Sequence, residues 1–275
     1  MQKKRMHNIM IFNKFINKIL CTFILLFYTL QTTYAFGNPT HERLTEAACN
    51  STHMLNVFDP NEKNGIITRL LKSCNIPDAE ETSWLMWGHF YDFNAERSDL
   101  TKDSALSRMY SHFQKAKSLW LNGNRFFAID ELGKSIHYMQ DMCCMVHTWG
   151  RFNNYFNLTT HRAYENALDK VAVAYFHKIS ISPDVFNFKF NRGMPIIGVA
   201  NLYVLKTLNR YDKTPPNASF LSFFDGLSTL RDVYVGSEKH RKEAMEAVPF
   251  EDFELAYQAT CELIYLFFQE VGINL

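Results

Sequence analysis

Two histidine–carboxylate pairs lie in the middle of the chain, each with a spacing of four residues. His137 and Asp141 form the first pair, His161 and Glu165 form the second, and His147 lies between them. Residues i and i+4 lie on one face of a helix, so each pair can hold one metal ion. These five donors fall within 29 residues. Nitrogen and oxygen ligands favour zinc or another borderline cation, and more than four protein ligands indicate more than one ion.

Three further candidate ligands lie closer to the N-terminus. They are His41 in the first turn of a predicted helix, Asp78 after a proline in a predicted loop, and His89 between aromatic residues. Taken alone, each is more typical of a capping or packing residue than of a ligand. Together with the central pairs they favour a metal centre, because buried charges need partners and a metal supplies them.

The first 35 residues are typical of a signal peptide. They contain five basic residues and no acidic residue, followed by a 12-residue apolar stretch at 19–30. That stretch is short for a membrane span. Small residues at Thr33 and Ala35 predict cleavage after Ala35, so that Phe36 becomes the new N-terminus. We expect export to the periplasm or the exterior; the alternative interpretation is an uncleaved membrane anchor.

Loss of this segment changes the charge of the protein. Residues 36–275 keep 24 Lys and Arg against 28 Asp and Glu, a formal charge of −4. Such a surface does not attract nucleic acid at long range, so no nucleic-acid partner is expected, although bound cations can reverse the local field. No segment indicates an obligate protein partner. The 240 remaining residues suffice for one domain with a substantial core.

Five cysteines remain after cleavage, namely Cys49, Cys74, Cys143, Cys144 and Cys261. An oxidising compartment permits disulfides, but an odd number leaves at least one thiol outside them. The adjacent Cys143 and Cys144 admit a metal-ligand interpretation. Their apolar helical surroundings favour ordinary burial instead, because reduced cysteine is often a core residue.

Apolar residues recur with helical spacing along the rest of the chain. The pattern predicts helices at about 39–57, 62–72, 104–121, 125–145, 160–179, 221–235 and 250–271. A loop is expected at 73–103, and a break at Asn122-Gly123-Asn124. No alternation of apolar and polar residues predicts a strand. We therefore expect an all-α fold, with one multi-helix domain over residues 36–275.

The candidate ligands lie in short segments that follow one another in a specific order. The segments are FGNPTH at 36–41, PD at 77–78, GHFYD at 88–92, LGKSIHYMQD at 132–141 and NLTTHRAYEN at 157–166, with His147 before the last. In this combination the chain resembles the zinc-dependent phospholipase C family, which shares its fold with the single-strand-specific zinc nucleases. The resemblance implies a helical catalytic domain of that type.

The resemblance also implies three zinc ions and a set of ligands. At the matching positions these are the amine and carbonyl of Phe36 and the side chains of His41, Asp78, His89, His137, Asp141, His147, His161 and Glu165. His147, His161 and Glu165 would hold a relatively separate ion. Asp78 would bridge two ions and act as the general base. Because Phe36 has no free amine before cleavage, zinc assembly would be coupled to export.

The implied activity is that of an exported zinc hydrolase. It would cleave phospholipids at a membrane surface, at the glycerol–phosphate ester, through attack of a zinc-activated water, and release diacylglycerol and a phosphorylated headgroup. Two alternatives stay open. One is a single-strand nuclease or nucleotidase on the same three-zinc scaffold, and the other is an inactive zinc-binding protein.

Two details bear on the choice between lipid and nucleic acid. The GHFYD segment and Glu165 resemble the phospholipase branch, although Phe93 stands where proline is usual. The opening Phe36-Gly37, with His41 following, is closer to the nuclease branch. We favour the phospholipid substrate.

Overall fold

The fold consists of α-helices joined by turns and short 3-10 segments. The computed structural model describes residues 38–80, 86–91, 100–144, 147–148, 168–169, 194–213 and 250–275. The elements are α2 (Asn38–Ser51), η1 (Met54–Val57), α3 (Lys63–Cys74), α4 (Ile76–Glu80), η2 (Met86–His89), α5 (Ala105–Leu121), α6 (Arg125–Asp141), α9 (Ile196–Lys213) and α13 (Phe250–Glu270). Within these ranges there is no strand, and the expected all-α fold is confirmed.

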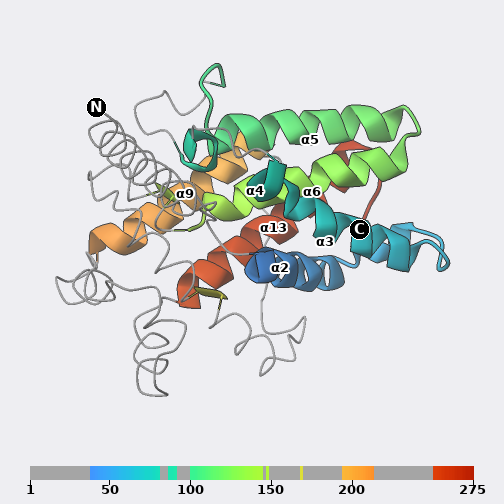
Figure 1. Cartoon of the computed structure of the whole chain (residues 1–275), viewed down its shortest axis with the longest axis horizontal. Helices are drawn as coiled ribbons and strands as arrows, with labels where there is room; N and C mark the ends of the chain where they lie inside the picture. The colour runs from blue at the N-terminus through green and yellow to red at the C-terminus, as the bar shows by residue number, and fades with distance from the viewer. Residues whose placement is uncertain are drawn as a thin grey trace, which may run out of the picture. The chain divides into compact units, whose positions relative to one another are not determined.

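Helix α6 lies at the centre of the packing. It runs antiparallel to α5 in a helical hairpin, and α3 packs along it (Figure 1). Helix α13 contacts α2, α6 and α9. Helices α2, α3, α5 and α13 thus all contact α6, whose C-terminal half carries His137 and Asp141.

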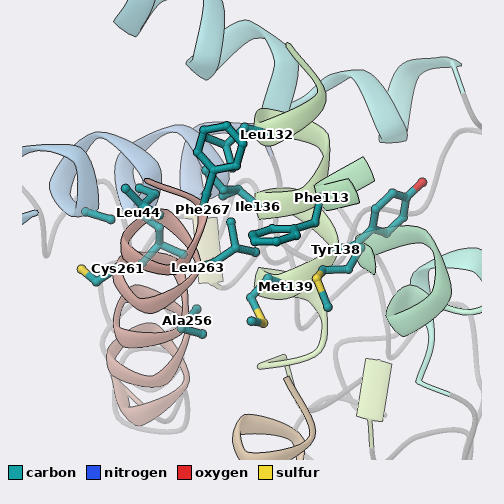
Figure 2. Close-up of a cluster of buried hydrophobic side chains, with 14 of the residues drawn as sticks. Leu44, Phe113, Leu132, Ile136, Tyr138, Met139, Ala256, Cys261, Leu263 and Phe267 are labelled. Atoms are coloured by element: carbon teal, nitrogen blue, oxygen red, sulfur yellow. The ribbon is translucent and has the colours of Figure 1, made fainter. Parts of the chain in front are cut away.

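The core between α5, α6 and α13 is rich in aromatic side chains. Phe267 on α13 makes edge-to-face contacts with Phe113, Trp120 and Phe268, with ring centroids 6.1, 5.7 and 5.1 Å apart. Figure 2 shows Phe267 among side chains from several helices, including Leu132 of α6. Burying one such side chain stabilises the fold by about 1.5–3 kcal/mol, and edge-to-face geometry adds to this. This core holds α6 in place.

The local sequence explains where α5 begins and where it ends. Ser104 and Ser107 form a capping box at the start of α5, each side chain accepting from the other's backbone N–H. At the other end Gly123 adopts φ +80°, which glycine tolerates best. The Gly123 and Asn124 amides then donate to the carbonyls of Trp120 and Leu119, both at 2.9 Å, and close a Schellman motif. The break expected at 122–124 is confirmed.

Gly133 on α6 allows α3 to approach closely. A Cβ atom at this position would lie 2.7 Å from the Ser73 Cβ and 2.9 Å from the Leu70 carbonyl oxygen. His137 lies four residues later, on the same face of α6. The close approach therefore brings the C-terminus of α3, which ends at Cys74, next to His137.

The N-terminal helix is shorter than its pattern predicts. Helix α2 ends at Ser51, not near Val57, and His53 takes a left-handed conformation with φ 56° before the separate turn η1. Met54 is buried, and Phe58 packs edge-on against Trp120. The burial of these two side chains requires the chain to turn where the periodicity alone would continue the helix.

The region expected to be a loop at 73–103 contains two short helical elements, α4 and η2. Asp78 therefore lies in a one-turn helix rather than in a loop. Pro77 is compatible with this, because the first turn of a helix leaves backbone N–H groups without intrahelical partners. Helix α6 ends at Asp141, four residues before the predicted end.

Helix α9 was not predicted, although its sequence carries the signal. Ile196, Val199, Ala200 and Tyr203 are buried at helical spacing, and Pro195 directly precedes the helix. Helix α13 agrees with the predicted range within one residue. The helices expected at 160–179 and 221–235 lie outside the described residues, except for the helical pair Leu168 and Asp169.

The expected signal peptide, residues 1–35, also lies outside the described residues, so the domain boundary at residue 36 stays a prediction. Elsewhere, among the helices that the structure describes, none has both the length and the hydropathy that crossing a bilayer requires.

Candidate metal centre

The first histidine–carboxylate pair converges as its spacing predicts. His137 and Asp141 both project from the last turn and a half of α6, and both are fully buried. The His137 Nε2 atom lies 3.3 Å from the Asp141 Oδ2 atom. This nitrogen and this oxygen can therefore face a common ion.

Helix α2 brings His41 to the same pair. The His41 Nε2 atom lies 3.6 Å from the Asp141 Oδ1 atom, and the His41 ring stacks on His137 with centroids 4.2 Å apart. His41 is also fully buried. His41, His137 and Asp141 offer ligand atoms that all lie within 4.8 Å of one another.

Asp78 and His89 complete a second group on the other side of His137. The His137 Nε2 atom lies 3.5 Å from the Asp78 Oδ1 atom and 3.2 Å from the His89 Nδ1 atom. The His89 Nδ1 atom in turn lies 3.8 Å from the Asp78 Oδ1 atom and 2.8 Å from the Asp141 Oδ2 atom. Asp78, His89 and His137 also keep their ligand atoms within 4.8 Å, so His137 belongs to both groups.

Backbone carbonyls orient two of the imidazoles. The Nδ1 atom of His137 donates to the Cys74 carbonyl oxygen at 2.7 Å, and the Nδ1 atom of His147 donates to the His89 carbonyl oxygen at the same distance. A neutral histidine that donates from one ring nitrogen has a lone pair on the other, as metal ligation requires. For His137 that other nitrogen is Nε2, which faces both carboxylates.

The close packing of ionisable groups in this site shifts their pKa values. Burial alone would lower the pKa of His137, but Asp141 and Asp78 outweigh it and raise the pKa to about 9. Burial likewise opposes ionisation of Asp141, yet His137 and His89 hold its pKa well below the usual range. The pKa of His41 falls to about 3, because burial and the neighbouring His137 both disfavour its charged form.

These observations fit a bound cation. Asp78 and Asp141 are two carboxylates almost fully removed from solvent, and isolated buried charges are costly. Within the described residues, the Asp141 Oδ1 atom is buried without a hydrogen-bond donor. Imidazole nitrogens and carboxylate oxygens at these separations form the donor set that zinc takes in catalytic sites. Both groups therefore suit zinc.

Of the remaining predicted ligands, the structure describes His147 alone. His147 lies next to the centre, with its ring stacked on Phe90 at 4.6 Å, but it joins neither group. Its expected partners His161 and Glu165 lie outside the described residues, as does Phe36. The relatively separate ion and the N-terminal ligand therefore stay predictions.

The cysteines take no part in either group. Cys49, Cys74, Cys143, Cys144 and Cys261 are all buried, and no disulfide joins them within the described part of the chain. Burial raises the pKa of the Cys49 thiol well above its usual value. These side chains behave as small core residues.

The family is established by the sequence itself. A profile of the family described as zinc dependent phospholipase C matches residues 40–218. The chain belongs to this family. Within the zinc-dependent phospholipase C match lie all the predicted ligands except Phe36, including both groups that converge on His137.

One solved structure supports the fold. The chain is similar to Clostridium perfringens alpha-toxin, in a crystal structure of the toxin from avian strain SWCP, with a TM-score of 0.53 and 15% sequence identity. The similarity covers 85% of this chain and 64% of the toxin chain, so this protein spans less than two thirds of the toxin's length. The comparison with curated proteins gives no match. At this identity the likeness concerns the fold alone.

Two groups that support the centre were missed by the sequence reasoning. One is the Cys74 carbonyl, which orients His137 and which no side-chain pattern can indicate. The other is Gln140, whose side chain contacts His41. The sequence did contain a signal for Gln140, because a glutamine next to a candidate ligand in a predicted helix needs hydrogen-bond partners if it is buried.

Proposed function

We propose that this protein is an exported zinc hydrolase that cleaves phospholipids at the glycerol–phosphate ester and yields diacylglycerol and a phosphorylated headgroup. Membership of the zinc-dependent phospholipase C family supports the substrate class. The observation that carries the proposal is the convergence of His41, Asp78, His89 and Asp141 around the shared His137. Such a buried donor set is built for ions rather than for packing.

The proposed ligands divide over two adjacent positions. His41 and Asp141 lie at one, and Asp78 and His89 lie at the other; the single lone pair of His137, on Nε2, could ligate an ion at either position but not at both. When bound, zinc supplies a Lewis acid that polarises the phosphate and lowers the pKa of water to about 7. The protein's own contribution is to hold the five side chains rigidly, because four of them come from helices packed on the core.

We assign the general base to Asp78. Its carboxylate is almost fully buried and lies within 4 Å of both His89 and His137. A carboxylate in this position can accept a proton from water that attacks the phosphate, or orient that water through a hydrogen bond. No serine or cysteine nucleophile is part of the proposal.

The proposed N-terminal ligand is compatible with the position of α2. The helix begins at Asn38, only two residues after Phe36, and His41 lies in its first turn. Two residues of extended chain span about 7 Å. Phe36 would thus be tethered close to the group that contains His41, provided that cleavage after Ala35 has released its amine.

The substrate is tested by headgroup release. Processed protein beginning at Phe36, loaded with zinc, is assayed on vesicles of phosphatidylcholine or phosphatidylethanolamine and on single-stranded DNA. The proposal predicts phosphorylated headgroup and diacylglycerol, with no DNA cleavage. Cleavage of DNA alone would identify the nuclease alternative, and bound zinc without either activity would identify an inactive zinc-binding protein.

The role of Asp78 is tested by substitution. We expect Asp78→Asn to keep much of its zinc and to lose turnover by about 100-fold or more, because the amide cannot accept the proton. Asp59→Asn makes the same chemical change at an exposed turn position and serves as the matched control. Turnover of Asp78→Asn equal to that of the control would remove Asp78 from the mechanism.

A further inference from the structure

Gln140 links the metal centre to two other helices through its buried amide. Its Oε1 atom lies 2.6 Å from the His41 Nδ1 atom on α2. Its Nε2 atom donates to the Thr45 hydroxyl at 3.1 Å and to the Thr260 hydroxyl at 3.0 Å. Gln140 is fully buried, and both ends of its amide are therefore engaged by protein groups.

The Thr260 hydroxyl fixes which way the amide points. Thr260 donates its own hydrogen to the Ala256 carbonyl oxygen at 2.7 Å. A hydroxyl that has donated its only hydrogen can only accept from a further neighbour. The group facing Thr260 must therefore be the NH₂ end of Gln140, which places the oxygen end against His41.

This orientation determines the tautomer of His41. An amide oxygen can only accept, so the His41 Nδ1 atom must carry the hydrogen. The lone pair of the neutral ring is then on Nε2, the atom that lies 3.6 Å from the Asp141 Oδ1 atom. In the opposite tautomer a hydrogen on Nε2 would point toward Asp141 and occupy the direction in which an ion binds.

We propose that Gln140 is a positioning residue that holds His41 in the metal-binding tautomer. The hydrogen-bond chain runs from the backbone of α13 through Thr260 and Gln140 to His41, so the C-terminal helix contributes to the centre without providing a ligand. Partners of this kind typically change metal affinity 10- to 100-fold. The inference rests on the proposed zinc site, since it assigns His41 as a ligand through Nε2.

The tautomer can be observed directly in metal-free protein. Nitrogen NMR of histidine-labelled protein distinguishes a ring nitrogen that bears hydrogen from one that bears a lone pair. We expect wild-type His41 to carry hydrogen on Nδ1. In Gln140→Leu the acceptor is lost, and we expect the hydrogen to move to Nε2, where Asp141 accepts it. A merely structural role for Gln140 would leave the tautomer unchanged.

Zinc affinity provides the second measurement, by competition with a chelator. Gln140→Leu should bind zinc about 10-fold or more weakly. Thr260→Val is nearly isosteric and removes only the hydroxyl that orients the amide, so it should show a smaller loss and a mixture of His41 tautomers. Thr207→Val is the matched control, because Thr207 is equally buried, donates to the Tyr203 carbonyl four residues earlier in α9, and lies outside this hydrogen-bond chain.

Several outcomes would overturn the proposal. One is a hydrogen on Nε2 of His41 in the wild-type protein. Another is a Gln140→Leu variant whose His41 tautomer and zinc affinity equal those of the wild-type protein. If Gln140→Leu does not fold, Thr260→Val provides the test. A His41 tautomer and a zinc affinity identical to those of Thr207→Val would then contradict the proposal. Failure of the wild-type protein to bind zinc would instead remove the proposed metal site, while the tautomer of His41 would still show whether Gln140 sets it.

Discussion

At the scale of single residues, His137 is the side chain on which the centre depends. It lies in both groups of candidate ligands, its Nδ1 atom is bonded to the Cys74 carbonyl, and its Nε2 atom faces two carboxylates. Those carboxylates raise its pKa to about 9 despite burial. In the metal-free protein at neutral pH, His137 therefore carries a proton on Nε2. This proton balances part of the negative charge of the two carboxylates, as a bound cation would.

Zinc should displace this proton. Calorimetric titration at pH 7.5 in two buffers of different ionisation enthalpy should show release of about one proton from His137 on binding. Apparent zinc affinity should increase with pH up to about 9, where His137 loses its proton unaided. Zinc binding without any proton release, and with no pH dependence between 7 and 9, would show that His137 Nε2 is not a ligand.

The same pKa has a consequence for the stability of the metal-free protein. Because the folded pKa of His137 is raised above its usual 6.5, protonation stabilises the folded state. This contribution is complete below about pH 6.5 and is lost as the pH rises through about 9. Protein with zinc bound at His137 Nε2 would not gain this stability, because that nitrogen would carry no proton.

At the scale of the elements, the contact between α3 and α6 positions the centre. Gly133→Ala would place a methyl group against the Ser73 side chain and the Leu70 carbonyl. Backbone atoms cannot yield as a flexible side chain does, so α3 must shift. We expect a loss of about 1–3 kcal/mol in the free energy of unfolding, together with weaker zinc binding as the Cys74 carbonyl moves away from His137.

Gly65→Ala is the control for this prediction. Gly65 lies in the first turn of α3, and a Cβ atom there would meet nothing within 4 Å. Alanine should stabilise this helix by about 0.5–1 kcal/mol. Urea unfolding measures both variants. Equal stability of the two variants would refute the close approach of α3 and α6 at Gly133.

The sequence predicted the helices whose signals are local. The turn at Gly123 and the pairing of His137 with Asp141 both follow from spacing and from glycine chemistry. The end of α2 at Ser51 could not be predicted in the same way, because it depends on the burial of Met54 among residues far away in the chain. Helix α9 shows the opposite case, in which an adequate periodic signal was overlooked.

At the scale of the whole molecule, the centre is assembled from distant parts of the chain. His41, Asp78 and His89 come from three different elements and meet at α6 only through packing of the helices on a common core. The types of these residues made them candidate ligands, and the resemblance to the zinc-dependent phospholipase C family implied the set as a whole. The distances between them, the tautomers and the support from Thr260 on α13 depend on tertiary structure and had no signal of their own.

Removal of residues 1–35 would also affect the molecule as a whole. If the amine of Phe36 is a ligand, protein extended at its N-terminus by a few residues should bind less zinc than protein beginning at Phe36. We expect a loss of about 10-fold or more in affinity at one site, with the helical content unchanged. Metal analysis and circular dichroism of the two forms measure this. Equal zinc content in both forms would exclude the terminal amine as a ligand.

The proposed hydrolase requires zinc bound by the buried histidines and aspartates. Anomalous diffraction at the zinc edge, from crystals of processed protein grown with zinc, tests this requirement most directly. We predict anomalous peaks at bonding distance, about 2.0–2.2 Å, from His137 Nε2 and from an Asp141 carboxylate oxygen. Zinc-saturated crystals without a peak beside either residue would contradict the account.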